Sequence, residues 1–125
     1  DVERSRGLGD VYKRQALGRR ALVELLEKDP GLQAVCCSSD TLAQGVMVEA
    51  LARGMRVPQD LAICGFGDAE FAAHTVPSIS TVHVDGPGIG RLAAQIIVSR
   101  SRGEQVAQTV HDLGFRLIER QSTGG

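Results

Sequence analysis

The sequence predicts an α/β fold in which helices flank a largely parallel sheet. Three observations support this prediction. Short apolar runs typical of buried strands alternate with longer segments whose apolar residues recur at helical spacing. The length of 125 residues suggests one domain, and 42% hydrophobic residues indicate a folded rather than a disordered chain. No internal repeat or low-complexity segment interrupts the alternation, as expected for an α/β domain.

The chain opens with a basic segment, residues 1–15, that has no apolar periodicity. We interpret this segment as non-native or disordered, so that residues 16–125 are the expected folded unit. The first helix is then predicted over residues 16–28, where a stripe of leucines lines one face. Pro30 follows this helix, and proline cannot continue it.

Two predicted strands enclose the second helix. Residues 33–37 ("QAVCC") form a short apolar run that indicates a buried strand. Apolar residues then recur about every four positions over 41–53, which predicts a helix, and Gly54 is suited to end it. Pro58 separates this helix from a second apolar run at 60–66 ("DLAICGF"), which we predict to be the next strand.

The remainder of the chain repeats the alternation. Residues 80–84 ("STVHV") predict a third strand. Residues 89–101 carry apolar side chains at the spacing of a strongly amphipathic helix. Two short apolar segments, 106–111 and 115–118, flank "DLG", and we predict that a hairpin or a tight connection joins them.

Three cysteines, Cys36, Cys37 and Cys64, lie in the predicted strands. Their odd number and the adjacent pair do not suit a disulfide framework, so we interpret them as buried thiols. The chain has neither the C-x2-C spacing nor the neighbouring histidine pair of a metal site. We therefore predict no metal and no cofactor.

The charge balance argues against a nucleic-acid-binding surface. The chain has 14 Lys and Arg residues against 15 Asp and Glu residues, which gives a net charge of -1. No apolar run reaches the roughly 18 residues of a membrane span, and no signal peptide opens the chain. These observations predict a cytoplasmic protein.

Polar and glycine residues follow two of the predicted strands at the point where each strand ends. Ser38 and Ser39 come directly after the first strand, and Phe66, Gly67 and Asp68 end or follow the second. In open α/β sheets, ligands bind beyond the carboxyl ends of the strands. Glycine also allows a ligand to approach the backbone closely. We therefore predict that these residues bind a ligand.

Asp40 stands at the start of the helix that follows the two serines. We predict that it caps this helix by accepting hydrogen bonds from backbone amides. Enzyme activity is not expected, because no G-x-S-x-G elbow surrounds the serines, although His74, His83 or His111 could complete a triad. The stretch 86–90 ("GPGIG") lacks phosphate-loop spacing, so it is predicted as a loop and helix start.

Three segments together resemble the effector-binding core of the LacI/GalR transcriptional repressors. They are residues 34–68 ("AVCCSSDTLAQGVMVEALARGMRVPQDLAICGFGD"), residues 77–82 ("PSISTV") and residues 120–125 ("RQSTGG"). Within this family, "CSSD", "GFGD" and "HVDGPGIGRLAAQ" resemble the gluconate-utilisation repressor branch. The resemblance extends from Leu17 to about Thr123.

The resemblance implies a periplasmic-binding-protein-like fold of type I. In this fold, two α/β subdomains are hinged around an effector, and a helix-turn-helix headpiece precedes them. Residues 16–125 resemble a partial effector-binding domain, mostly the C-terminal subdomain plus a hinge-crossing segment after "STVHV". The headpiece is expected to be missing from this chain, so operator DNA would be bound only through that absent part.

The resemblance also implies a homodimer that senses a sugar or a sugar acid. The dimer-facing surface would include the helix over 41–53 and the stretch 71–77. The residues implied for this interface are Leu42, Gln44, Val46, Phe71, His74 and Thr75.

Two positions depart from the family pattern. The family often has Asn at Ser39 and Asp at Gly67, and those groups bind sugar hydroxyls. A carboxylate at Gly67 would repel an anionic ligand, so its absence favours an acidic effector such as gluconate. Two alternatives stay open: a fragment of a periplasmic sugar-binding transport protein of the same fold, and an α/β enzyme. The enzyme is disfavoured, because no nucleophile, base and orienting group converge in the sequence.

Overall fold

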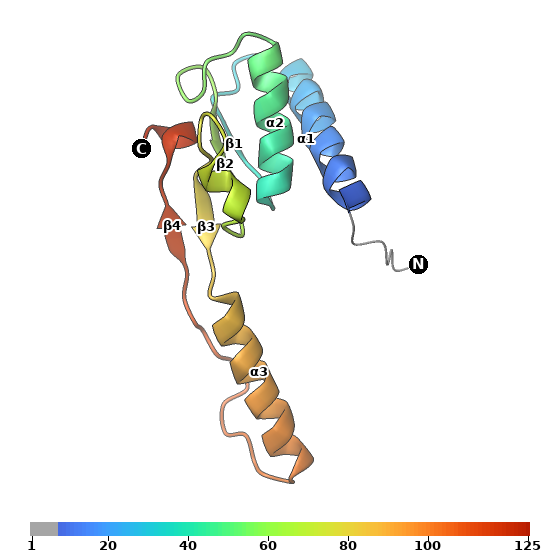
Figure 1. The fold of residues 1–125 in the computed structure, drawn as a ribbon, viewed down its shortest axis with the longest axis vertical. Helices are drawn as coiled ribbons and strands as arrows, with labels where there is room; N and C mark the ends of the chain where they lie inside the picture. The colour runs from blue at the N-terminus through green and yellow to red at the C-terminus, as the bar shows by residue number, and fades with distance from the viewer. Residues whose placement is uncertain (1–7) are drawn as a thin grey trace.

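The computed structural model describes residues 8–125, and in it helices and strands alternate as the sequence predicts. The elements are α1 (Leu8–Lys28), β1 (Ala34–Cys36), α2 (Asp40–Ala52), β2 (Ala62–Cys64), the 3-10 helix η1 (Glu70–Ala73), β3 (Thr81–His83), α3 (Gly86–Ser101), β4 (Arg116–Ile118) and the 3-10 helix η2 (Gln121–Thr123). Figure 1 shows α1 and α2 side by side next to the strands, whereas α3 extends away from them.

The strands form an open sheet that is parallel except at one edge. β1 pairs with β2 in parallel, and a single parallel bridge between Cys64 and Ser80 continues the sheet towards β3. β4 then pairs with β3 in the antiparallel direction, with His83 opposite Arg116. The parallel sheet that the sequence predicts is therefore confirmed for β1 to β3.

The core lies between the two packed helices and β2. Its largest buried side chains include Leu22 of α1, Val46 of α2 and Ile63 of β2. The helices approach very closely where Gly18 meets Gly45, because a Cβ atom at Gly18 would clash with the carbonyl oxygen of Leu42. Glycine is needed at this crossing for its lack of a side chain.

Two predicted helix starts were too late. α1 begins at Leu8 rather than at residue 16. Residues 1–7 lie outside the described part of the chain, and the non-native origin of residues 1–15 stays a prediction. α3 begins at Gly86, because Pro87 suits the first turn and the Asp85 carboxylate accepts a hydrogen bond from the Gly88 amide at 2.9 Å. The predicted loop at 86–90 is thus the first turn of α3.

The predicted hairpin was wrong. Residues 106–111 form no strand, and β4 pairs with β3 instead. The return from α3 brings β4 alongside the free edge of β3, where it completes the backbone hydrogen bonds of that strand. Tertiary placement therefore decided the partner of β4, whereas the prediction used only the neighbouring segment.

The cysteines are less buried than predicted. Cys36 is exposed, and Cys37 and Cys64 are half-buried, since Cys36 and Cys64 lie on the sheet face opposite Val35 and Ile63. Only Cys37 packs against the core. Burial, with smaller contributions from the neighbouring thiols and Asp40, raises the pKa of Cys37 to about 11.

α3 contributes nothing to the core. None of its residues is buried, and three of its apolar side chains, Ile89, Ile97 and Val98, are exposed. The returning segment adds exposed Phe115 and Leu117. These exposed apolar side chains give the chain a surface that favours association in water.

We expect the 125-residue chain to self-associate through this surface. Ile97 is 67% exposed, and burying such a side chain contributes about 1.5–3 kcal/mol. Ile97→Glu should therefore weaken association by roughly tenfold or more in sedimentation velocity across a concentration series. The matched control is Gln95→Glu, a new charge at an exposed position of the same helix. A wild-type chain that stays monomeric, with a thermal transition independent of concentration, would contradict this expectation.

Candidate functional site

Backbone hydrogen bonds tie the carboxyl ends of β1, β2 and β3 together. The amide of Cys37 donates to the carbonyl of Cys64 at 2.8 Å, and the amide of Asp40 donates to Phe66 at 3.1 Å. The amide of Gly67 donates to the carbonyl of Val82 at 2.9 Å. The structure therefore brings the two predicted ligand-binding segments, 38–39 and 66–68, to the same edge of the sheet. We call this edge the strand-end site and residues 66–68 the effector loop, after the effector that the resemblance to the LacI/GalR repressors implies.

The cap of α2 is Ser39, so the assignment of this role to Asp40 was wrong. Ser39 has extended backbone dihedral angles, and its hydroxyl accepts a hydrogen bond from the Leu42 amide at 3.2 Å. Asp40 is already the first helical residue. The helix begins one residue earlier than predicted. Serine and aspartate are both preferred caps, so the sequence alone did not decide between Ser39 and Asp40. The ligand-binding roles of Ser38 and Ser39 stay predictions.

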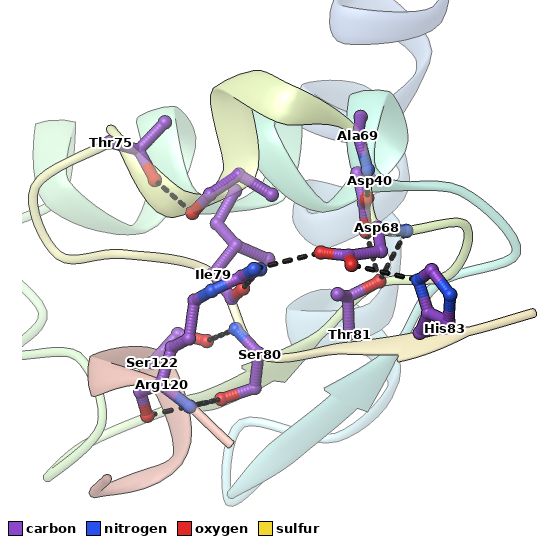
Figure 2. A network of polar contacts seen from close by, with 11 residues as sticks. Asp40, Asp68, Ala69, Thr75, Ile79, Ser80, Thr81, His83, Arg120 and Ser122 are labelled. Carbon is purple, nitrogen blue, oxygen red and sulfur yellow. Dashed lines mark hydrogen bonds and ion pairs between the residues drawn. The ribbon is translucent and has the colours of Figure 1, made fainter. Parts of the chain in front are cut away.

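Asp40 is instead a buried cross-link behind the strand-end site. Its side chain is 1% exposed. One carboxylate oxygen accepts a hydrogen bond from the Thr81 hydroxyl, and the other accepts one from the Ala69 amide, both at 2.6 Å (Figure 2). Gly65 leaves room for this carboxylate, since a Cβ atom there would clash with it. Asp40 thus joins α2 to β3 and to the segment after the effector loop.

The effector loop has an exposed and unusual backbone. Phe66 and Gly67 are exposed, and no atom lies within 4 Å of the position that a Gly67 Cβ would occupy. Gly67 has a φ of 115°, which favours glycine, and Asp68 has a φ of 54°, in the left-handed region. The loop therefore has an exposed backbone in a conformation that L-residues rarely adopt, while the Gly67 amide itself donates to the Val82 carbonyl.

Asp68 is held by side chains from two other segments. One carboxylate oxygen accepts from Arg120 Nη2 at 2.7 Å, and the other lies 2.9 Å from His83 Nδ1 (Figure 2). The Asp68 amide donates to the Thr81 hydroxyl at 3.2 Å. The Arg120 guanidinium lowers the pKa of Asp68, His83 adds a smaller decrease, and desolvation partly opposes both. Asp68 is ionised and paired, and its predicted ligand role is untested.

The C-terminal segment supports the strand-end site through hydrogen bonds from Arg120 and Ser122. The buried Ser122 hydroxyl accepts a hydrogen bond from the Ser80 amide at 2.8 Å (Figure 2). The same hydroxyl donates to the Ile63 carbonyl. The Ser80 hydroxyl in turn accepts from the Arg120 amide at 2.7 Å. Sequence reasoning assigned no role to Arg120 or Ser122, and only the "RQST" motif drew attention to this segment.

The residues implied for a dimer interface differ in accessibility. Val46 is 2% exposed and packs in the core of its own chain, so its assignment to the interface was wrong. The α1 crossing covers this side of α2. His74 is exposed, and the other implied residues, Leu42, Gln44, Phe71 and Thr75, are half-buried. For these five, dimer contact stays a prediction.

Two features are absent from the part of the chain that the structure describes. Among residues 8–125, no helix is long and apolar enough to cross a membrane. In the same part of the chain, no three or more His, Cys, Asp or Glu side chains are grouped so that they could hold a metal ion.

Comparison with known proteins places these features in a family context. The sequence profile of the periplasmic binding protein-like domain matches residues 2–123. The HTH-type transcriptional regulator GntR of Pseudomonas aeruginosa is 39% identical over 108 residues, 86% of this chain and 32% of the regulator. The chain thus spans about a third of the length of the curated relatives it matches.

Solved structures of transcriptional regulators share the fold of this chain. The transcription regulator GntR from Chromobacterium violaceum superposes with a TM-score of 0.81 at 36% identity, covering 89% of this chain and 41% of that one. A LacI family transcriptional regulator from Arthrobacter sp. FB24, in complex with lactose, has a TM-score of 0.75 at 27% identity, covering 87% of this chain and 41% of that one. These similar proteins are transcriptional regulators rather than enzymes.

Proposed function

Since this chain belongs to the periplasmic binding protein-like domain family, we propose that it forms part of the effector sensor of a LacI-type transcriptional regulator. One observation carries the proposal: segments 38–39 and 66–68 meet at the carboxyl ends of the strands, where ligands bind in open α/β sheets. The relatives are regulators, so a transport protein of the same fold is not favoured. A regulator of this type would act in the cytoplasm, where the DNA is.

We propose a sugar or sugar acid as the effector. The regulator from Arthrobacter that shares this fold is in complex with lactose, which supports a carbohydrate. In the effector loop, Gly67 contributes no carboxylate, and the Asp68 carboxylate is already paired with Arg120 and His83. The loop therefore presents backbone groups without an unpaired negative charge, which favours an anionic sugar acid such as gluconate.

Titration calorimetry tests this function in the complete protein. Gluconate and lactose are the two probes, and glucitol serves as an uncharged polyol control. Saturable binding of gluconate that is stronger than that of glucitol would support the sugar-acid effector. Binding of lactose alone would support a neutral sugar instead, and no binding of any probe at millimolar concentration would count against the proposal.

We expect the complete protein to form a homodimer that a negative charge at Gln44 or Thr75 weakens. Gln44→Glu is isosteric, so a loss of dimer reports charge rather than shape. Thr75 donates to the Pro77 carbonyl at 2.9 Å, and Thr75→Asn is the neutral control for Thr75→Asp. Each charged variant should raise the dissociation constant by about tenfold, as expected when one interfacial charge is left unpaired. Equal sedimentation of charged and neutral variants would contradict the interface.

We expect these 125 residues to show no sequence-selective binding to operator DNA. The chain has a net charge of -1, and phosphate binding requires a concentrated positive surface. DNA binding is assigned to a headpiece elsewhere in the complete protein. A gel-shift titration in low and high salt checks this, with poly(dI-dC) as competitor. Salt-sensitive binding that survives the competitor would show that the chain itself recognises DNA.

A further inference from the structure

We propose that Arg120 and His83 are positioning residues that couple effector affinity to β3 and β4, the two strands that connect the sheet to α3. This inference rests on the proposed function, because it concerns how the same effector loop keeps its shape. Neither residue needs to touch the effector. Both act through Asp68, which is the last residue of the effector loop.

The loop needs external support, because two consecutive residues have positive φ. Gly67 lies at 115° and Asp68 at 54°, and the second of these conformations is unfavourable for a residue with a side chain. A strained loop keeps such a conformation only when its surroundings fix it. Contacts to Asp68 therefore decide whether the Gly67 backbone is presented in one orientation.

Arg120 is well suited to fix Asp68, because it is itself anchored at several atoms. Nη2 donates to the Asp68 carboxylate at 2.7 Å, while Nη1 donates to the Ile79 carbonyl at 2.9 Å. The Arg120 amide donates to the Ser80 hydroxyl, and that hydroxyl donates to the Arg120 carbonyl at 3.0 Å. The planar guanidinium thus joins the effector loop to the backbone just before β3, and a flexible ammonium group cannot make both contacts in the same geometry.

The two partners of Asp68 flank the connection to α3. His83 is the last residue of β3, from which the chain continues into α3, and Arg120 follows the end of β4, on which the chain returns. α3 has no buried residue and extends away from the core (Figure 1). A reorientation of α3 relative to the core would therefore act on β3 and β4, and through His83 and Arg120 it would reach the effector loop.

Hydrogen exchange and calorimetry on the complete protein test this coupling. Arg120→Met removes both guanidinium bonds, and Arg120→Lys restores the charge. The matched control is Arg20→Met, the same change at an exposed residue of α1, away from the effector loop. We expect Arg120→Met to speed amide exchange at Gly67 and Asp68 by at least about tenfold, the size expected for losing a hydrogen bond to a charged group. Amides in α2 should change little.

The same variants should separate positioning from general stability. We expect Arg120→Met to raise the dissociation constant for gluconate by roughly tenfold, with partial recovery in Arg120→Lys and no change in Arg20→Met. His83→Leu should act in the same direction but less. The inference would be overturned if Arg120→Met left amide exchange at Gly67 and Asp68 at the wild-type rate. It would also be overturned if amide exchange rose equally throughout α2. If wild type does not bind gluconate, the proposed effector fails, whereas the exchange rates measured without ligand still decide this inference.

Discussion

Replacing Asp40 with alanine is expected to lower the free energy of unfolding of the complete protein by about 3 kcal/mol or more. The carboxylate accepts two hydrogen bonds inside the structure, from Thr81 and from the Ala69 amide. Hydrogen bonds to a charged group contribute roughly 1.5–3 kcal/mol each, and Asp40→Ala leaves both donors without an acceptor. The position of Asp40 in the first turn of α2 adds a favourable interaction with the helix dipole.

Urea denaturation of three variants checks this expectation. Asp40→Asn keeps one acceptor oxygen, so it should lose less stability than Asp40→Ala. Asp60→Ala is the control, because Asp60 pairs with Arg56 at the surface, where ion pairs contribute little. Equal losses in Asp40→Ala and Asp60→Ala would show that the buried carboxylate is not a cross-link. A normal stability for Asp40→Ala would lead to the same conclusion.

The second large effect is expected at Gly67, where a carboxylate should selectively weaken the binding of an acidic effector. Any side chain at Gly67 meets the strain of a φ of 115°, so Gly67→Asp alone would mix charge with conformation. Gly67→Asn has nearly the same size and shape but no charge. The difference between the two variants therefore isolates the electrostatic contribution.

We expect gluconate to bind Gly67→Asp about tenfold or more weakly than Gly67→Asn. A like charge at contact distance costs about 1 kcal/mol in water and up to about 4 kcal/mol in a partly wet cleft. A difference of about 1.4 kcal/mol corresponds to a tenfold change in affinity. Lactose should bind the two variants within about twofold of each other, or favour the carboxylate through hydroxyl hydrogen bonds. Calorimetric titrations that show equal gluconate affinities for Asp and Asn would refute the charge argument.

The elements that could be predicted from the sequence are those with a local signal. The apolar spacing in α2 and the glycine at position 54, with a φ of 73°, were sufficient to place that helix and its end. The convergence of 38–39 and 66–68 also followed, since carboxyl ends of neighbouring parallel strands meet at one edge. In both cases the information lies within a few residues of the element itself.

The errors concern contacts between distant segments. Ser39 and Asp40 are both good caps, and the distant Ala69 and Thr81 draw Asp40 into the interior. Val46 lies on a helix face whose burial depends on the close crossing with α1. Arg120 is 52 residues from Asp68, so no local pattern indicates that they pair. Each error reflects a tertiary interaction that outweighs the local preference.

The buried position of Ser122 has a consequence for the synthesis of the protein on the ribosome. Its hydroxyl joins the Ile63 carbonyl to the Ser80 amide, two groups made 59 and 42 residues earlier. A nascent chain that ends before Ser122 leaves both groups unpaired, although α1, α2 and β2 are already complete. The two hydrogen bonds of Ser122 behind the strand-end site therefore close only after Ser122 has left the ribosome, later than the packing of α1 on α2 can form.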